Sequence, residues 1–522
     1  MQNLESYLGG KWVQGEGDGA ILVNPATDEH IARTSTAGID FAGALNHARC
    51  VGNPALQSLT FAERADILRA LAEAVVRHRT ELLGLSTLNN GATRSDSKFD
   101  VDGASFTLQA YADLGESLGD RRYLVDGDSE ELLRSKRLAG LHVKVPKCGV
   151  AVHVNAFNFP AWGMAEKMAV ALLAGMPVFT KPATATALTS WRMAQAFVET
   201  GALPDGVFSF LAGSAGDLVD HLQYGDVLAF TGSGALGTRF KSASHLASQG
   251  ISVNVEADSL NAAVLGPDVE PGTDTWDLFI RDVFRDLHQK TGQKCTAIRR
   301  VLVPESMIDD VTDALVDAAS GLKIGNPSNG DVRMGPVVNR RQQQDVLDGL
   351  SRLGNAVEKI YGSERPEHLL DVSEGQGCFV GLHLFRAADP SASMSASIVH
   401  DEEVFGPATT LLPYDGSVVQ AASMVALGKG GLVSSVYTDD RAYARDLVLA
   451  LAPHHGRLTL GSAKIADSSP GPGTVLPQLV HGGPGRAGGG EELGGIRGLD
   501  FYLQRTAIQG YRPLLERLFD GS

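Results

Sequence analysis

Cys295 is the residue of this sequence whose type and setting best suit covalent chemistry. It follows Gly292-Gln293-Lys294, a glycine-containing turn after an amphipathic segment, where its thiol could face a cleft. A thiolate attacks carbonyl carbons, and the tetrahedral adduct formed with an aldehyde can expel hydride to a nicotinamide. A single cysteine can equally be a small buried apolar side chain. The local sequence leaves both interpretations open.

Glu256 also has two interpretations. It ends the segment SVNVE, and parallel sheets place active sites at the carboxyl ends of their strands. A partly desolvated glutamate at such a place can activate water. However, residues 232–237 satisfy GxGxxG, and Glu256 lies 19 residues after the last of these glycines. A Rossmann dinucleotide site carries its ribose-binding acid at about that distance, and composition does not separate the two roles.

Two further polar residues follow predicted strands. Asn158 lies in the segment 156–160, where its amide could donate a hydrogen bond to a developing oxyanion or could cap the next helix. Lys181 ends the following strand, where it could meet a phosphate or a ribose, or could be an ordinary solvated lysine. Neither residue decides a function by itself.

The elements that must position these residues alternate between strands and helices. Strands are predicted at 149–155 and 176–182 and helices at 160–175 and 186–201, and the segments VFSFLAG, DVLAFTG and SVNVE continue the alternation. This rhythm predicts βαβ units and a parallel sheet. One helix is predicted from about 61 to 89, ending at Asn89-Asn90-Gly91. A second α/β region is predicted after Asn261, with a helix over 276–287, a strand over 299–304 and, near the end of the chain, an aromatic strand-like segment, DFYLQRTAIQ.

Composition excludes several classes of protein. A chain of 522 residues exceeds one typical core, so at least two large domains are expected. The net charge of −16 argues against nucleic-acid or anionic-membrane partners reached through bulk electrostatics. The N-terminus lacks the features of a signal peptide, and no apolar run is long enough to span a bilayer. The four cysteines form no CxxC pair and no His/Cys cluster with zinc spacing, so we expect no metal, a reducing compartment and a cytoplasmic location.

Taken together and in order, the motifs resemble those of the aldehyde dehydrogenase superfamily over nearly the whole chain. They are FNFP (157–160), KPAT (181–184), FTGSGALG (230–237), the glutamate strand, GQKC (292–295), EEVFGP (402–407) and GGPGRAGGGEELG (482–494). The resemblance implies an α/β aldehyde dehydrogenase fold. A Rossmann-like cofactor domain would comprise 1–125 and 150–256, and an α/β catalytic domain 257–470. A small β oligomerisation element with the C-terminal segment would comprise 126–149 and 471–522, and the protein would be a homo-oligomer, by expectation a homodimer.

The resemblance also implies a role for each matching residue. Cys295 would be acylated after hydride loss, Glu256 would activate the deacylating water, and Asn158 would hold the oxyanion with the backbone N–H of the cysteine. Glu492 matches a glutamate that relays protons behind the base, although it could equally be a structural acid in a tight turn. Lys181 and Glu403 would hold the cofactor riboses. The full set implied to bind the cofactor is Phe157, Lys181, Ala183, Thr184, Gly213, Gly216, Thr231, Gly232, Ser233, Glu403 and Phe405.

Two positions depart from the usual family pattern. The glutamate segment, commonly ELGGK, here reads EADSLN from Glu256, which weakens the transfer of neighbouring backbone roles but retains the carboxylate. NAD-preferring members commonly carry glutamate two residues after the proline of KPA-E, whereas this chain has Thr184. Because a carboxylate there would repel a 2′-phosphate and a hydroxyl beside Lys181 would tolerate one, we predict NADP over NAD, with NAD as the alternative cofactor.

The variant motifs narrow the expected substrate. HVNAFNFPAWG, EADSLN, GQKCTAIRR and LVHGGPGRAGGGEELGG are similar to the branch that acts on aromatic-degradation intermediates held as coenzyme A thioesters. The small-molecule partner would be a semialdehyde such as that of 3,4-dehydroadipyl-CoA, oxidised to the acid. Because the sequence ends soon after the last of these motifs, we expect a stand-alone enzyme without a hydratase domain; a split system with a separate hydratase is the alternative. Alternatives are an oxepin-CoA-derived semialdehyde from phenylacetate degradation, a CoA-acylating reaction and a non-catalytic binding role. The sequence does not locate a coenzyme A site.

Overall fold

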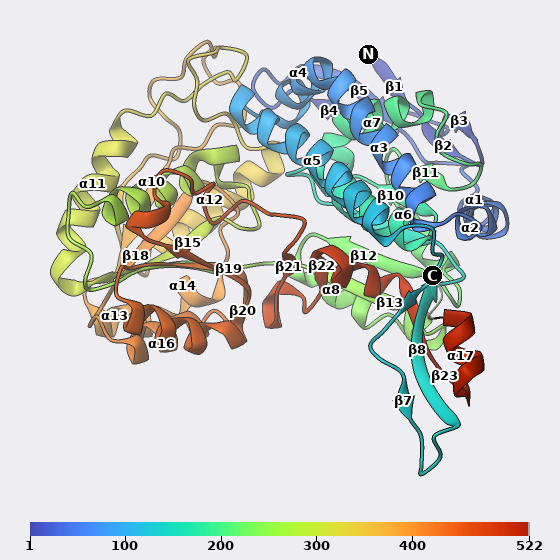
Figure 1. Cartoon of the computed structure of the whole chain (residues 1–522). Coiled ribbons are helices and arrows are strands. Elements are labelled where there is room, and N and C mark those ends of the chain that lie inside the picture. The colour runs from blue at the N-terminus through green and yellow to red at the C-terminus, as the bar shows by residue number, and fades with distance from the viewer. Residues whose placement is uncertain (520–522) are drawn as a thin grey trace.

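The computed structural model describes residues 1–519 and arranges them as two α/β lobes and a projecting ribbon (Figure 1). The first lobe contains a seven-stranded sheet whose five strands from β13 to β11 run parallel. In spatial order its strands are β13 (Ser252–Glu256), β12 (Val227–Thr231), β9 (Ala151–Val154), β10 (Val178–Lys181), β11 (Phe208–Phe210), β2 (Ser6–Leu8) and β3 (Lys11–Val13). A small sheet at the N-terminus contains β1 (Gln2–Leu4), β5 (His30–Thr34) and β4 (Ala20–Val23). The predicted βαβ alternation is confirmed.

Some of the helices of this lobe, α1, α3, α5 and α8, begin at a side chain that caps their first turn. The lobe contains α1 (Phe41–His47), α2 (Asn53–Gln57), α3 (Phe61–Arg77), α4 (Arg79–Asn90), α5 (Arg94–Leu118), α6 (Trp162–Ala174), α7 (Ala187–Glu199), α8 (Gly234–Lys241) and α9 (Ser244–Ser248). Thr60 and Glu63 form a capping box at the start of α3. The single helix predicted from 61 to 89 is wrong, because the backbone at His78 (φ −96°, ψ 10°) leaves the helical region and separates α3 from α4.

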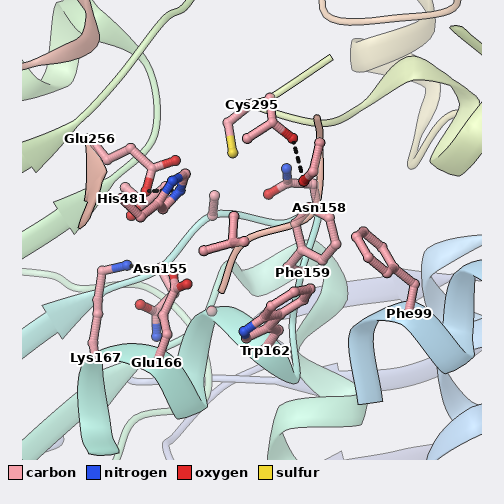
Figure 2. Close-up of a pocket in the computed structure, with 16 residues that line it drawn as sticks. Phe99, Asn155, Asn158, Phe159, Trp162, Glu166, Lys167, Glu256, Cys295 and His481 are labelled. Atoms are coloured by element: carbon pink, nitrogen blue, oxygen red, sulfur yellow. Dashed lines mark hydrogen bonds and ion pairs between the residues drawn. The ribbon is translucent and has the colours of Figure 1, made fainter. Parts of the chain in front are cut away.

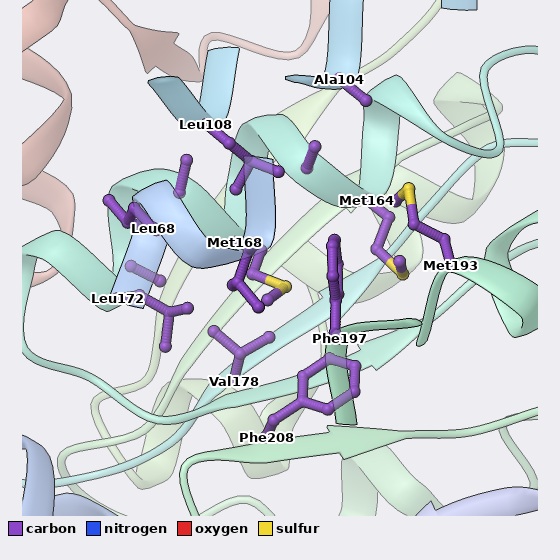
Figure 3. Packing of buried hydrophobic residues seen from close by; sticks show 14 of the residues in the cluster. Leu68, Ala104, Leu108, Met164, Met168, Leu172, Val178, Met193, Phe197 and Phe208 are labelled. Atoms are coloured by element: carbon purple, nitrogen blue, oxygen red, sulfur yellow. The ribbon is translucent and has the colours of Figure 1, made fainter. Parts of the chain in front are cut away.

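Helix α6 lies in the core of the first lobe. Its residues are almost all buried, and it ends at Gly175, whose φ of 99° is left-handed. Figure 3 shows Met164, Met168 and Leu172 of this helix packed with residues of α3, α5, α7 and the sheet. Burying one such side chain is worth about 1.5–3 kcal/mol. The packing fixes α6, and with it the polar residues that α6 carries, against the sheet.

The second lobe contains another seven-stranded sheet. Its order is β16 (Glu358–Tyr361), β17 (His383–Arg386), β18 (Ala408–Tyr414), β15 (Ile298–Pro304), β14 (Asn261–Leu265), β19 (Gly431–Tyr437) and β20 (His455–Gly461). All neighbours are parallel except β16 with β17. The helices of this lobe are α10 (Asp274–His288), α11 (Ile308–Ser320), α12 (Arg340–Gly354), α13 (Pro390–Ser395), α14 (Ser397–Asp401), α15 (Val418–Ala426) and α16 (Arg441–Leu451). The predicted second α/β region, its first helix and its strand over 299–304 are confirmed.

The last part of the chain returns to the first lobe. A hairpin of β21 (Val480–Gly482) and β22 (Glu491–Leu493) contacts α6 and β13. The chain then forms β23 (Leu503–Tyr511), which pairs along its length with β8 (Leu138–Pro146), and β8 also pairs β6 (Leu124–Val125) and β7 (Glu130–Glu131). Helix α17 (Arg512–Phe519) packs on this ribbon through Leu515. Over residues 1–519, no helix is both long and apolar enough to cross a bilayer.

Candidate active site

Cys295 and Glu256 lie at the junction of two adjoining cavities. The larger cavity, of about 670 Å³, is bounded by the ends of β10 and β12 and by residues 401–405. The smaller one, of about 40 Å³, is bounded by α5, α6 and the loop before β21 (Figure 2). The residues that line both cavities are Asn155, Ala156, Asn158, Thr231, Glu256 and Cys295. The sequence-predicted nucleophile, base and oxyanion donor are therefore brought together.

The loop that carries Cys295 is held in an unusual conformation. After α10, Lys290 and Thr291 have φ of 53° and 55°, and Gly292 has φ of 67°. A Cβ on Gly292 would lie 2.1 Å from the carbonyl oxygen of Gly406, so only glycine fits this approach. Asn261 Nδ2 donates to the carbonyl oxygen of Cys295 at 2.8 Å. Tertiary contacts thus fix the position of the nucleophile.

Glu256 ends β13 and faces both Cys295 and His481. Its carboxylate forms an ion pair with His481 Nε2 at 3.2 Å, and both side chains are buried. The Sγ of Cys295, a carboxylate oxygen of Glu256 and a ring nitrogen of His481 lie within 4.8 Å of one another. Burial alone would raise the pKa of Glu256, but the charges of His481 and Lys167 outweigh it and lower that pKa to about 2. Glu256 is therefore ionised and beside the thiol.

The protonation of the other two members of this group follows from the same contacts. Burial raises the pKa of the Cys295 thiol well above its ordinary value, and the charge of Glu256 raises it further. Burial opposes protonation of His481, yet the Glu256 carboxylate raises the pKa of its imidazole. The favoured arrangement is a neutral thiol, a carboxylate and an imidazolium. Glu256 can accept a proton from a thiol or a water beside it.

A second buried cluster of charges adjoins Glu256. Lys167 Nζ on α6 lies 3.2 Å from Glu166 Oε1 and 3.0 Å from Glu492 Oε2. Carboxylate oxygens of Glu166, Glu256 and Glu492 lie within 4.8 Å of one another. Burial raises the pKa of Glu166 to about 7, against the opposing charge of Lys167, and burial also raises the pKa of Glu492. Glu492 is thus part of strand β22 and next to the base, and the cluster can hold a proton passed from Glu256.

The side-chain amide of Asn158 is free to donate a hydrogen bond. Its side chain is buried beside Cys295 (Figure 2), and across residues 1–519 its amide makes no hydrogen bond. The N-cap residue of α6 is Ala161, so Asn158 does not cap that helix. An uncommitted amide beside the nucleophile is suited to bind the oxyanion formed when a carbonyl is attacked.

The larger cavity contains most of the residues predicted to bind a cofactor. Those that line it are Phe157, Lys181, Ala183, Thr184, Thr231, Gly232, Ser233, Glu403 and Phe405. Gly213 and Gly216 are not in its lining; both have positive φ, and a Cβ at these positions would meet Thr36 and Phe41, respectively. The GxGxxG segment (232–237) begins after β12 and continues into α8. Glu256, which could have been its ribose-binding acid, instead lies beside Cys295.

The polar groups of this cavity suit a dinucleotide. Within the described chain, the Lys181 ammonium has no hydrogen bond or ion pair, and burial lowers its pKa to about 8. The hydroxyl of Thr231 is buried without a partner among the same residues. Glu403 accepts from the backbone N–H of Ser259 at 2.8 Å and from Arg299 Nε at 3.4 Å. These groups can bind ribose hydroxyls and phosphates, so the lining fits a nicotinamide dinucleotide.

Aromatic side chains form the wall nearest the nucleophile. The rings of Phe157 and Phe405 meet edge to face with centroids 5.7 Å apart, and both line the larger cavity. Arg299 lies over the Phe405 ring at 5.5 Å from its centroid, which orients that ring from behind. A flat nicotinamide can pack against such a wall.

His481, Lys167 and Glu166 are site residues that sequence reasoning missed. His481 begins a segment interpreted only as glycine-rich, and it meets Glu256 across more than two hundred residues of chain. No spacing rule connects residues so far apart. Lys167 could have been found, because a lysine among the apolar residues of α6 must be buried and therefore needs partners.

The comparisons with known proteins agree with this geometry. A sequence model described as the aldehyde dehydrogenase family matches residues 12–508. The chain is 42% identical over 481 residues to 3,4-dehydroadipyl-CoA semialdehyde dehydrogenase of Aromatoleum evansii, covering 92% of this chain and 93% of that protein. It is 28% identical over 429 residues to aminoaldehyde dehydrogenase 2 of Solanum lycopersicum, covering 79% of each.

The same fold is found in a solved structure. Betaine aldehyde dehydrogenase of Staphylococcus aureus, in complex with NAD⁺, superimposes with a TM-score of 0.83 at 25% identity, covering 97% of this chain and 94% of that one. The family match spans nearly the whole chain, and a nucleophilic cysteine, a carboxylate and an amide meet at a cavity suited to a dinucleotide. The chain therefore belongs to the aldehyde dehydrogenase family and is an oxidoreductase that acts on aldehydes.

Proposed function

We propose that this enzyme oxidises a semialdehyde at the far end of an acyl-coenzyme A to the carboxylic acid, with NADP preferred over NAD. The observation that carries the proposal is the 42% identity, over 92% of the chain, to an enzyme named for 3,4-dehydroadipyl-CoA semialdehyde. The cofactor preference is supported by Thr184, which lines the larger cavity where a carboxylate would repel a 2′-phosphate. An oxepin-CoA-derived semialdehyde is the alternative within the same substrate class.

The reaction follows from the positions of three side chains. Cys295 gives its thiol proton to Glu256, which passes it on to the carboxylates around Lys167 and is ionised again. The sulfur attacks the aldehyde carbon while the Asn158 amide donates to the resulting oxyanion. A nicotinamide cofactor in the larger cavity would supply the hydride acceptor, and loss of hydride from the tetrahedral adduct would leave the substrate as a thioester on Cys295. Glu256 then takes a proton from water, the hydroxyl adds to the acyl carbon, and the C–S bond breaks to release the acid. The carboxylates around Lys167 lie next to Glu256 and can receive its proton.

Turnover of matched substrates tests the substrate class. We expect NADPH to form with 6-oxohexanoyl-CoA at a higher kcat/KM than with hexanal, which has the same chain length without coenzyme A. Cys295→Ala should abolish turnover with both, because Cys295 supplies the only thiol among the described residues that line the two cavities. Wild-type enzyme that uses hexanal as efficiently as 6-oxohexanoyl-CoA would refute the substrate class, and activity of Cys295→Ala would refute the nucleophile.

Glu256 distinguishes hydrolysis from transfer of the acyl group to free coenzyme A. Glu256→Gln removes the water-activating carboxylate but leaves the thiol, so we expect a burst of NADPH of about one equivalent and then a stall. Glu491→Gln, at an exposed carboxylate one residue before Glu492, is the control and should turn over normally. Steady-state turnover of Glu256→Gln at the wild-type rate, or dependence of the wild type on added coenzyme A, would favour the acylating alternative.

Thr184 tests the cofactor preference. The wild type should have a higher kcat/KM for NADP than for NAD, and Thr184→Glu should invert the ratio because its carboxylate would repel the 2′-phosphate and bond a free ribose hydroxyl. Thr184→Ser keeps the hydroxyl and should keep the wild-type ratio. Equal efficiency with both cofactors in the wild type would contradict the assignment.

A further inference from the structure

A third cavity adjoins the smaller cavity at Cys295 and shares no lining residue with the larger cavity. It has a volume of about 460 Å³, and Phe99 of α5 lines both it and the small cavity at Cys295. The loop before β21 also separates the two, since Gly473 and Val475 line the small cavity and Pro470 and Thr474 line the third. The three cavities thus follow one another from the cofactor side, past Cys295, to the outer surface.

The lining of this third cavity is strongly cationic for a chain whose net charge is −16. Its charged residues are Arg94, Arg281, Arg285, Arg333, His288 and Asp96. Asp96 is buried and shares a hydrogen bond with Thr93, and burial raises its pKa. Burial also lowers the pKa of His288, which favours its neutral form. Four guanidinium groups therefore face a single carboxyl group within the lining.

These guanidinium groups have few charged partners. In the described part of the chain, the Arg94 side chain makes no hydrogen bond or ion pair, and Arg333 bonds only backbone, with Nη1 donating to the carbonyl oxygen of Gly330 at 2.9 Å. Arg285 donates to the carbonyl oxygen of Pro470 at 3.0 Å, and Asp282, the nearest acid to it, lies 3.8 Å away. Uncommitted N–H groups of arginine are well suited to bind phosphate oxygens in pairs.

We propose that this cavity, lined by Arg94, Arg281, Arg285 and Arg333, binds the phosphorylated adenosine end of a coenzyme A-linked substrate. The inference rests on the proposed function, and it gives the enzyme a site for the nucleotide part of the substrate. A coenzyme A semialdehyde has its aldehyde at one end and its phosphates at the other, joined by an uncharged pantetheine arm. With the cofactor on one side of Cys295, the substrate must approach from the other, along Phe99. The arginines lie where the phosphates would remain while the aldehyde reaches Cys295.

A double charge reversal tests this site. Arg94→Glu and Arg333→Glu change the two arginines of the lining whose side chains make no hydrogen bond or ion pair with distant parts of the described chain, so the fold should be retained. With 6-oxohexanoyl-CoA we expect kcat/KM to fall at least tenfold through KM, with kcat little changed. With hexanal we expect kcat/KM to be unchanged. Raising the salt concentration should lower kcat/KM of the wild type for 6-oxohexanoyl-CoA but not for hexanal.

Controls separate this proposal from its alternatives. Arg445→Glu on α16 reverses an exposed arginine outside the cavity and should affect neither substrate. The free acid 6-oxohexanoate distinguishes phosphate binding from carboxylate binding. If the double variant lost as much kcat/KM with 6-oxohexanoate as with 6-oxohexanoyl-CoA, the phosphate assignment would be overturned. If the wild type prefers 6-oxohexanoyl-CoA and the double variant keeps that preference, the site is wrong while the proposed function stands. If the wild type has no preference, both are wrong.

Discussion

A buried carboxylate works as a base only if it is ionised, and at Glu256 this condition depends on His481. Taking a carboxylate out of water favours its neutral form, so burial at the end of β13 opposes the role we propose for Glu256. His481 lies 3.2 Å away, equally buried, and its charge reverses the effect. Oε2 is the oxygen that pairs with His481, whereas Oε1 has no hydrogen bond or ion pair within residues 1–519 and can accept a proton from water.

Replacing His481 should therefore change the pH dependence of turnover. His481→Gln removes the positive charge that lowers the pKa of Glu256, so that pKa rises and the base is protonated at higher pH. The acidic limb of the kcat profile should move upward in pH, and below the raised pKa kcat should fall by about tenfold per pH unit. His221→Gln, which removes a half-buried histidine paired with Asp217, is the control. An unchanged profile in His481→Gln would show that the ion pair does not tune the base.

Single residues of the site differ in how far the sequence reveals them. Cys295, Glu256 and Asn158 lie in recognisable motifs. They meet because each lies at or just after the end of a strand or a helix. The charges around Lys167 come instead from α6 and β22, which are joined only by folding, since Lys167 and Glu492 are 325 positions apart. Local patterns therefore identify reactive groups but not the groups that set their pKa values.

At the scale of elements, the loop between α10 and β15 determines where the nucleophile lies. Gly292 allows this loop to pass against Gly406, next to the Glu403 and Phe405 side of the cofactor cavity. Any side chain at position 292 would meet a backbone carbonyl oxygen as well as an unfavourable φ. The loop thus couples the position of Cys295 to the wall that contacts the cofactor.

Gly292→Ala should displace this loop. We expect a loss of stability of about 1–3 kcal/mol and a fall in kcat of at least tenfold, because Cys295 would move relative to Glu256 and Asn158. Gly321→Ala is the matched control, since its φ is negative and a Cβ there would meet nothing within 4 Å. Thermal unfolding and NADPH formation measure the two effects. Wild-type kcat in a fully folded Gly292→Ala protein would contradict this account.

Elements themselves were predictable where periodicity and caps agree. The strands from β9 to β13 are short apolar runs between turn residues, and α6 ends at its predicted glycine. The break at His78 was missed because no glycine or proline marks it. Both α3 and α4 contact α5 and α7, so the break lies between two helices that the same partners hold in place. Such a break depends on the partners of a helix and not on its own composition.

At the scale of the whole molecule, the site exists because two sheets and a returning hairpin meet. β10, β12 and β13 end on one side, the Cys295 loop comes from the second lobe, and β21–β22 closes the space between them (Figure 1). Alternating strands and helices predict each sheet but not the position of one sheet relative to the other. The resemblance to a family implied in advance that Cys295, Glu256 and Asn158 act at one site, which the strand pattern alone did not.

The projecting ribbon is the part of the molecule through which we expect copies of the chain to associate. β23 is the edge strand of its sheet, and in residues 1–519 no strand pairs with its outer side. Tyr511, Leu514 and Leu518 nearby are about half exposed. A long unpaired edge with apolar neighbours is a template for pairing with another copy. We therefore expect light scattering to give a mass that is a multiple of 55.1 kDa.

Proline substitution on β23 tests whether this edge holds the oligomer together. In antiparallel strands, consecutive residues direct their N–H groups to opposite sides, so either Thr506 or Ala507 bonds β8 and the other faces outward. Thr506→Pro and Ala507→Pro therefore form a matched pair. The variant that loses the outward N–H should remain folded and dissociate, while the other should lose thermal stability. If both variants keep the wild-type mass while folded, the copies associate through another surface, and the exposed edge of β23 has no part in assembly.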